Sequence, residues 1–432
     1  MQEAIRIGKE FTWIILGQAV AFVGSLLLVR ILTDNLATAE YGELALVLSF
    51  SGVVFQVVMG AINNGISRFY SISMLQNDVL GYLNASYRLV ISGTAVVTAA
   101  TFIVLVLLYA FDSFQWFWLI VATLTLSLIT SYNNALNAIQ NAARQRIVVA
   151  FHTALQSILK LLLVFIVFDV FDSTNSTIII VSYSIVALVV VFSQSIFLKR
   201  LVSNLQEKKS DNLSTTPNDW YGKMIKFSLP FSYWGIFSWA QSISDRWALE
   251  TFSSIEEVGQ FAVVYQVGYG SIIMLNKVAT SLISPILYER SGELGQTAKT
   301  VKVHKTAWHI TYAAILVSLL AWIVVIFSHQ DIFKILVAPE YQEVSKYLPW
   351  LILAGGLFSS GQVLSIKILS ELSSKKLLPI KIITAILAVL LNFLGAAQFG
   401  LAGVVGAMVL FSTIYLVWVM VTARNQFSTN NV

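Results

Sequence analysis

The stretch AEYGELALV, at Ala39–Val47, returns in degraded form as EEVGQFAVV at Glu256–Val264. The central glycines of the two copies, Gly42 and Gly259, are separated by half the length of the 432-residue chain. Each copy follows a long apolar run that carries an arginine near its end. The chain is therefore an internal duplication, an arrangement common in membrane proteins that enclose a path between two repeats.

Composition excludes a water-soluble globule. The chain is 57% hydrophobic and 11% charged, with a mean hydropathy of +0.77, whereas soluble domains carry about 25% charged residues. It has no cysteine, which excludes disulfides, thiol catalysis and thiolate metal sites. The four histidines show no ligand spacing, and the net charge of +5 is modest. We therefore expect no metal, no cofactor and no nucleic-acid partner.

The first apolar run, 11–32, follows Arg6 and Lys9 and could be mistaken for a signal peptide. It is longer than the roughly 7–15 residues of a signal core. It also has a counterpart in the second half of the chain. We predict that it is a retained first membrane span.

Apolar stretches of about 20 residues are long enough to cross a bilayer as helices. The sequence predicts twelve of them, at 11–32, 43–65, 88–111, 115–140, 147–169, 177–198, 227–250, 258–285, 306–328, 347–370, 377–396 and 400–423.

The placement of lysine and arginine supports this count, because basic residues gather on the cytoplasmic side of a membrane. With the N-terminus inside, 21 of the 27 basic residues fall in inner segments, and only Lys334 and Lys346 fall in outer loops. The remaining four lie within spans. Both termini are therefore predicted to be cytoplasmic.

The widest inner connection is polar and rich in residues that break helices, so it is predicted to link two halves. The expected organisation is an N-terminal six-helix bundle at 1–200, a cytoplasmic linker at 201–225 and a C-terminal six-helix bundle at 226–432. Six spans per half is an even number, which makes the repeat parallel, about an axis along the membrane normal.

Lys160 lies deep in the fifth predicted span, where a basic side chain costs roughly 2.5–3.5 kcal/mol at mid-bilayer. His152 and Gln156 share its helix face at i−8 and i−4. Such a stripe predicts a water-filled cavity, since intramembrane ionisable groups usually face an interior path. The alternative is a lysine that is hydrogen-bonded to neighbouring helices.

Amide side chains are concentrated near the end of the fourth predicted span, where Asn133, Asn137, Gln140, Asn141 and Arg144 share one helical face. Amides both join helices in membranes and bind hydroxyl-rich ligands such as sugars. Both interpretations stay open from the sequence for Asn133, Asn134, Asn137, Gln140 and Asn141.

Asp245 and Arg246 are neighbours in the seventh predicted span, so we expect that they do not pair with each other along one helix face. Asp245 is instead expected to reach Arg30 in the first span, as a gate pair near the outer end. Direct contact with a passenger is the alternative role.

The charges within the spans sum to a positive surplus, which suits an anionic passenger. Arginine and lysine both bind phosphate well. Asp245 is the acidic group in this set, and the basic groups are Arg30, Lys160, Arg246 and Lys277.

The chain resembles the Wzx-type polysaccharide (O-antigen) flippases of the multidrug/oligosaccharidyl-lipid/polysaccharide exporter superfamily. The similarity covers essentially the whole chain, in short motifs whose order and spacing are characteristic. The matching residues are Val29-Arg30-Ile31-Leu32, Glu40-Tyr41-Gly42, Phe227-Ser228-Leu229-Pro230, Ser244-Asp245-Arg246, Glu257-Val258-Gly259, Ser284-Pro285, Leu391-Asn392-Phe393 and Phe399–Ala407.

The resemblance implies a MATE-like all-α membrane protein whose two six-helix bundles form a V and open alternately to either side. It implies a location in the bacterial inner membrane and a passenger of undecaprenyl-diphosphate-linked oligosaccharide, carried to the periplasmic leaflet. A polysaccharide polymerase and a chain-length regulator are the expected partners. No enzymatic activity is expected.

Two other functions stay open. A drug/cation antiporter of the same superfamily needs an acidic residue in its N-terminal bundle, but the first span, 11–32, has no aspartate or glutamate. A membrane polysaccharide polymerase needs a carboxylate cluster or a sizeable outer loop for sugar chemistry, and the sequence shows neither.

Overall fold

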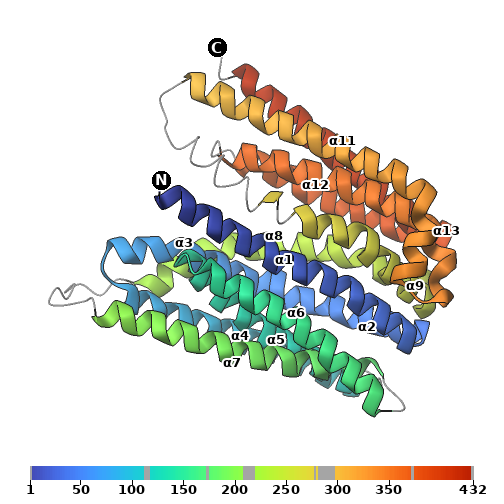
Figure 1. Cartoon of the computed structure of the whole chain (residues 1–432), viewed down its shortest axis with the longest axis horizontal. Coiled ribbons are helices and arrows are strands. Elements are labelled where there is room, and N and C mark those ends of the chain that lie inside the picture. Colours follow the sequence, from blue (N-terminus) through green and yellow to red (C-terminus); the bar gives the residue numbers. More distant parts are fainter. Residues whose placement is uncertain are drawn as a thin grey trace. The chain divides into compact units, whose positions relative to one another are not determined.

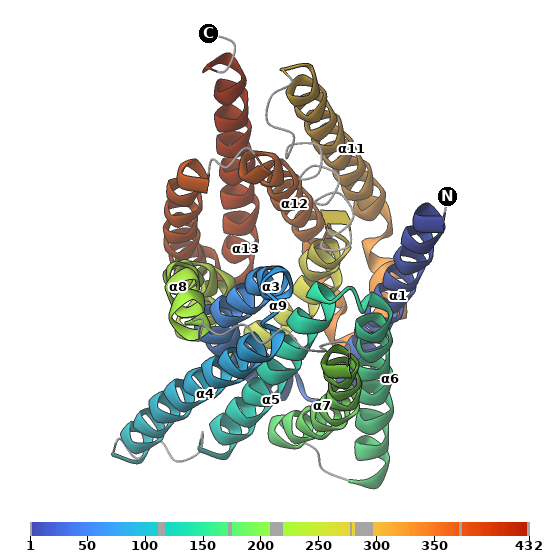
Figure 2. The same ribbon diagram turned by 90° about the vertical axis from the view of Figure 1, so that its left-hand side faces the viewer.

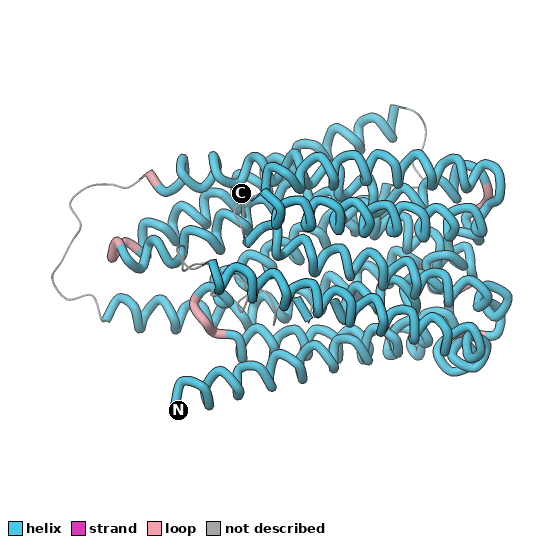
Figure 3. The backbone as a smooth tube through the Cα atoms, turned by 90° about the horizontal axis from the view of Figure 1, so that it is seen from above, coloured by secondary structure: helices cyan, strands magenta, loops and turns pink. Residues whose placement is uncertain are grey.

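The computed structural model describes residues 2–110, 117–171, 175–207, 219–276, 279–280, 297–370 and 374–429. Every regular element in these ranges is a helix (Figure 3). The elements are α1 (Gln2–Asn35), α2 (Thr38–Val53), η1 (Val54–Met59), α3 (Gly60–Leu75), α4 (Val79–Ala110), α5 (Phe117–Ala142), α6 (Arg146–Val170), α7 (Ser176–Glu207), α8 (Trp220–Phe252), α9 (Ile255–Tyr265), η3 (Gln266–Gly270), α11 (Thr297–Leu336), η4 (Pro339–Tyr347), α12 (Leu348–Ser370) and α13 (Ser374–Thr429).

Ten helical segments of the described residues are long and apolar enough to cross a membrane. The segment Leu377–Arg424 holds two predicted spans, which Gly400 divides with a φ of +53°. The 33-residue helix α8 carries a further predicted span with Pro230 inside it. The ten segments contain eleven predicted spans, because Leu377–Arg424 holds two, and α8 adds the twelfth.

Short polar side chains begin several of these helices, because the first amide groups of a helix have no partner within it. Asp78, Asn175, Asp219 and Ser254 each accept a hydrogen bond from the backbone N–H three residues later, over 2.9–3.3 Å. These caps fix where α4, α7, α8 and α9 begin.

The chain divides into two compact units by its internal contacts. One unit comprises Met1–Leu28 and Leu46–Trp239, and the other comprises Val29–Ala45 and Ala240–Val432. These bounds differ from the two expected bundles, because the end of α1 and the start of α2 belong with the second unit. The first part of α8 belongs with the first unit.

In the first unit, α5 packs against α3 and α7, and α6 packs against α7 (Figure 2). Helix α1 approaches α6 through small residues spaced by two turns. An added Cβ at Gly17 would overlap the backbone of Ala150, and one at Gly24 would overlap the hydroxyl of Ser157. Small residues let membrane helices approach closely in this way, so these glycines serve packing.

The start of α8 is fixed to the first unit by an aromatic cluster. The indole of Trp220 donates to a carboxylate oxygen of Asp78 at 2.7 Å. The rings of Phe69 and Tyr82 meet that of Trp220 edge to face. The buried hydroxyl of Tyr82 donates to the carbonyl of Ile66 at 2.7 Å.

In the second unit, α12 packs against both α11 and α13 (Figure 1). The two halves of α13 fold back at Gly400, and Gly395 and Gly403 meet backbone to backbone. Glu257 accepts a hydrogen bond from the N–H of Leu401 at 3.2 Å, which caps the second half of α13. This hairpin is the last motif on which the sequence resemblance rests.

The repeated glycines contact each other in the second unit, where α2 crosses α9. An added Cβ at Gly42 would overlap the carbonyl of Ile255 and lie 3.1 Å from the nitrogen of Gly259. An added Cβ at Gly259 would overlap the carbonyl of Thr38 and lie 3.1 Å from the nitrogen of Gly42. Since Thr38 and Ile255 each lie four residues before their glycine, the contact is reciprocal.

Candidate functional site

The first unit contains a cavity of about 430 Å³ whose wall is formed by three segments. These segments are the continuous helix of η1 and α3, the end of α5, and the middle of α8. Six amide side chains and three aromatic rings line the cavity, and no lining residue is charged. The lining residues are Phe55, Gln56, Gly60, Ala61, Asn63, Asn64, Asn134, Asn137, Ala138, Asn141, Phe231, Trp234, Gly235 and Ser238.

The η1 segment shapes one wall. It is a single π-helical stretch within an otherwise α-helical span, and the N–H of Gly60 reaches back five residues to the carbonyl of Phe55. Helix α8 crosses this stretch at Gly235, where a Cβ would overlap the carbonyl of Gln56. Gly235 thus lets α8 approach closely and brings Trp234 and Ser238 to the cavity.

The amides of α5 divide into two sets. Asn133 and Gln140 are buried and bind Gln194 of α7: the Asn133 amide donates to Gln194 at 2.9 Å, and Gln194 donates to Gln140 at 2.6 Å. Asn134 and Asn141 line the cavity instead. The amides of α5 thus divide between helix contacts and the cavity wall, and the binding of a hydroxyl-rich ligand by the cavity amides stays a prediction.

Asn137 belongs to both sets. Its carbonyl accepts from Gln194 at 2.7 Å, and its amide donates to Asn133 at 3.1 Å, yet it also lines the cavity. The network holds the α5 wall in register against α7.

The sequence analysis did not identify the polar residues on the other two walls of the cavity, which η1, α3 and α8 form. Gln56 and Asn63 lie seven residues apart, which places them two turns apart on one helix face, and Asn64 follows directly. Amides spaced in this way within an apolar span are a signal that could have found them. Trp234 and Ser238 carry no comparable signal.

The predicted stripe on α6 faces α7. His152 is 2% exposed and forms hydrogen bonds with the Val148 carbonyl at 2.8 Å and the Ser193 hydroxyl at 3.1 Å. The Lys160 ammonium lies 4.7 Å from the ring centroid of Tyr183. These contacts agree with the alternative in which the stripe joins neighbouring helices. The cavity role of Lys160 and Gln156 stays a prediction.

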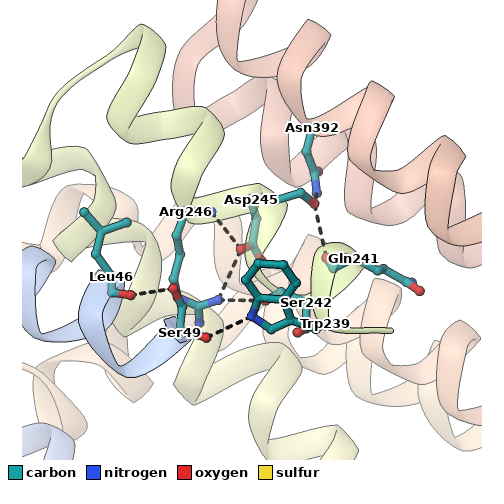
Figure 4. Close-up of polar contacts among 9 residues, drawn as sticks. Leu46, Ser49, Trp239, Gln241, Ser242, Asp245, Arg246 and Asn392 are labelled. Carbon is teal, nitrogen blue, oxygen red and sulfur yellow. Dashed lines mark hydrogen bonds and ion pairs between the residues drawn. The ribbon is translucent and has the colours of Figure 1, made fainter. Parts of the chain in front are cut away.

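Asp245 and Arg246 form an ion pair, so the expectation that they do not pair is wrong (Figure 4). The Asp245 carboxylate accepts from the backbone N–H of Arg246 at 2.7 Å and from its guanidinium at 3.1 Å. The same guanidinium nitrogen also donates to the carbonyl of Ser242, one turn earlier, at 3.4 Å. The guanidinium carbon also lies 4.6 Å from the ring centroid of Tyr265.

Arg30 has other partners than Asp245. Its guanidinium pairs with Asp34 at 2.7 Å and donates to the carbonyls of Lys334, at 3.3 Å, and Val337, at 2.5 Å. It thus binds backbone carbonyls at the end of α11, which have no partner within the helix. The structure does not bring the predicted gate pair together.

Lys277 lies outside the described residues. Within the described ranges, no group of three or more histidine, aspartate or glutamate side chains could hold a metal ion.

No family model matches the sequence, and no curated protein sequence matches it. Solved structures do match over nearly the whole chain. Lipid II flippase MurJ in an inward closed conformation superposes with a TM-score of 0.68 at 12% identity, covering 96% of this chain and 87% of the other.

An inward-facing multidrug resistance MATE family transporter of the MOP superfamily superposes with a TM-score of 0.62 at 16% identity, covering 95% of each chain. A variant of the Vibrio cholerae MATE transporter VcmN superposes with a TM-score of 0.61 at 13% identity, covering 98% of each. The chain has the fold of these transporters. The MATE-like, all-α membrane fold predicted from the sequence is thereby confirmed.

Proposed function

We propose that the protein is a flippase that moves undecaprenyl-diphosphate-linked oligosaccharides from the cytoplasmic to the periplasmic leaflet of a bacterial inner membrane. In this proposal the saccharide enters the amide-lined cavity while the polyprenyl tail stays in the bilayer, and the cycle proceeds by alternating access. A polymerase and a chain-length regulator would act on the delivered units.

The chemistry of the cavity is the observation that carries the proposal. Its six amides are Gln56, Asn63, Asn64, Asn134, Asn137 and Asn141. Each amide both donates and accepts hydrogen bonds, as a ligand covered with hydroxyl groups requires. Trp234 adds a flat apolar face. The volume falls within the range of about 300–1,000 Å³ typical of small-ligand sites.

The same lining argues against a cation antiporter. No aspartate or glutamate is among the residues that line the cavity. Without a carboxylate, the cavity offers no counter-ion to a cationic drug and no acid to exchange protons. The fold also accommodates a lipid passenger in at least one other protein, the lipid II flippase named above.

The proposal is tested by replacing two cavity amides, Asn134 and Asn141, with leucine. Leucine is close to asparagine in size but cannot form hydrogen bonds. The double variant loses two hydrogen bonds of about 1 kcal/mol each. The transport rate at low substrate concentration should therefore fall roughly 10- to 30-fold. Asn84→Leu is the matched control, since Asn84 is an exposed asparagine of α4 that does not line the cavity.

Transport is measured in proteoliposomes with a fluorescent polyprenyl-diphosphate-linked oligosaccharide, from the fraction that a membrane-impermeant quencher cannot reach. Wild type and Asn84→Leu should move the substrate, whereas Asn134→Leu/Asn141→Leu should not at low concentration. Transport by all three proteins at one rate would refute the assignment of the cavity. No transport by wild type, together with proton-coupled drug uptake, would favour the antiporter.

A further inference from the structure

A second cavity, of about 620 Å³, lies in the second unit, between the start of α11 and the end of α13. Three basic side chains and two aromatic rings surround it, together with two apolar side chains. Its lining residues are Lys305, Trp308, His309, Tyr312, Met420, Val421 and Arg424. It shares no residue with the amide-lined cavity of the first unit.

The depth of this cavity follows from where the apolar segments end. In the sequence, Lys305 directly precedes the apolar stretch 306–328, and Arg424 directly follows the apolar stretch 400–423. The cavity therefore lies where both spans meet the head-group layer. The distribution of basic residues predicts that this end faces the cytoplasm.

The basic groups are available to a ligand. Lys305, His309 and Arg424 are exposed, and within the part of the chain that the structure describes no carboxylate pairs with any of them. The rings of Trp308 and Tyr312 lie 5.3 Å apart and tilt by 34°. Tryptophan and tyrosine favour the membrane interface, where one part of the ring is apolar and another is polar.

The end of α13 beside the cavity is held in place by a buried lysine. Lys367 of α12 is fully buried, and its ammonium donates to the carbonyl of Ala423 at 3.2 Å, directly before Arg424. Trp308 packs against the buried cluster of α12 and α13 that contains Ala423 and Ile368. The end of α13 is thus fixed against α12, which positions Arg424 opposite the start of α11.

We propose that this cavity binds the phosphate of an anionic phospholipid head group from the cytoplasmic leaflet. Lys305 and Arg424 supply the positive charge, and the Arg424 guanidinium matches the geometry of phosphate oxygens. Basic pockets between transmembrane helices on the cytoplasmic side suit such head groups. Tyr312 and Val421, which are exposed, offer the acyl chains an apolar path along the helices.

The test compares lipid retention by the full-length protein in nanodiscs that hold equimolar phosphatidylglycerol and phosphatidylcholine. Native mass spectrometry of the released protein counts bound lipids of each kind. Lys305→Gln/Arg424→Gln should weaken phosphatidylglycerol binding about 30-fold, since each basic residue near the surface contributes about fivefold. Lys199→Gln/Arg200→Gln removes the same charge from exposed positions of α7 and should bind as wild type does.

Each outcome decides the proposal. Equal phosphatidylglycerol binding by both double variants overturns it, as does equal retention of phosphatidylcholine and phosphatidylglycerol by wild type. If glycerol phosphate, at a concentration equal to that of the lipid, displaces the bound phosphatidylglycerol, the site binds free phosphate. This outcome also overturns the proposal. Lys305→Glu/Arg424→Glu gives an independent check, because reversing both charges should abolish selective binding. Transport of oligosaccharide is not the readout, so failure here leaves the proposed function standing.

Discussion

On α5, a shift of one residue along the helix decides whether an amide side chain contacts α7 or faces the cavity. On α5, Asn133 and Gln140 bind Gln194, whereas Asn134 and Asn141 face the cavity. The two sets differ by one residue in register, which turns a side chain by about 100° around a helix. The sequence could predict the polar face, but the position of α7 decides which amides join helices.

The Asp245–Arg246 ion pair predicts that substitutions of these two neighbouring residues have coupled effects on the free energy of unfolding. The two carboxylate contacts are partly buried, with Asp245 3% exposed. Removing either partner leaves a charge with little water around it, so Asp245→Ala or Arg246→Ala should each cost about 3 kcal/mol or more. The double variant should cost less than the sum, with a coupling of about 0.5–3 kcal/mol. Thermal unfolding in detergent provides the measurement.

A second double-mutant cycle, between Arg30 and Asp245, serves as the comparison for the Asp245–Arg246 coupling. Since Arg30 binds Asp34 and the end of α11 in this structure, Arg30→Ala and Asp245→Ala should be additive. A coupling between Arg30 and Asp245 as large as that with Arg246 would contradict the pairing described and restore the gate pair expected from the sequence.

The proposed diphosphate-linked passenger predicts a role for two lysines of the predicted spans, Lys160 and Lys277. Lys160→Gln/Lys277→Gln keeps polarity but removes two positive charges, so export of polysaccharide should fall at least tenfold, because an anion loses favourable field. Lys199→Gln serves as the control, since Lys199 is exposed near the end of α7. Surface polysaccharide on a gel, normalised to protein level, is the measurement. Full export by the double variant would exclude both lysines.

At the scale of elements, the α2–α9 crossing predicts a sharp difference between glycines. A methyl group at Gly42 or Gly259 overlaps a carbonyl oxygen of the partner helix, whereas one at Gly406 meets nothing within 4 Å. Gly42→Ala and Gly259→Ala should each destabilise the protein by about 1–3 kcal/mol, the cost of overpacking. Gly406→Ala should be neutral or stabilise it by up to about 1 kcal/mol through helix propensity.

Melting temperatures of the three alanine variants in one detergent test this order. A Gly42→Ala variant as stable as Gly406→Ala would show that the two helices do not cross at these glycines.

The elements also mark the limit of sequence reasoning. Hydropathy predicts spans because a helix in lipid must satisfy its own backbone and expose apolar side chains. It does not predict the π-helical segments Val54–Met59 and Gln266–Gly270. A π-helical turn changes the hydrogen-bond pattern and leaves composition unaltered. The local shape of the cavity wall at Gln56 therefore cannot be predicted from hydropathy.

At the scale of the whole chain, the distribution of basic residues predicts the topology. Reporter fusions after Lys209 and Arg424 should give a cytoplasmic signal, since 21 of 27 basic residues fall in segments predicted to be inner. A fusion after Lys346, in a predicted outer segment, should give the opposite signal. A periplasmic signal after Lys209 or Arg424 would overturn the orientation.

The sequence predicts the duplication but does not predict which residues form each compact unit. Val29–Ala45 belongs with the second unit because Arg30, Thr33 and Tyr41 all bind there. Thr33 accepts from the N–H of Ala338 at 3.2 Å, and the ring of Tyr41 meets that of Tyr341 edge to face. Contacts between residues some 300 positions apart leave no trace in local hydropathy.

The reciprocal contact of Gly42 with Gly259 has an evolutionary consequence. Each glycine packs against the backbone carbonyl that lies four residues before the other glycine. Both sides of the contact therefore come from copies of one motif. Two identical half-length chains carrying a single copy would form the same contact as a two-fold symmetric homodimer. An ancestor of half this length would have needed no second surface to assemble, and gene fusion would then have freed the copies to diverge, leaving the glycines as the mark of that origin.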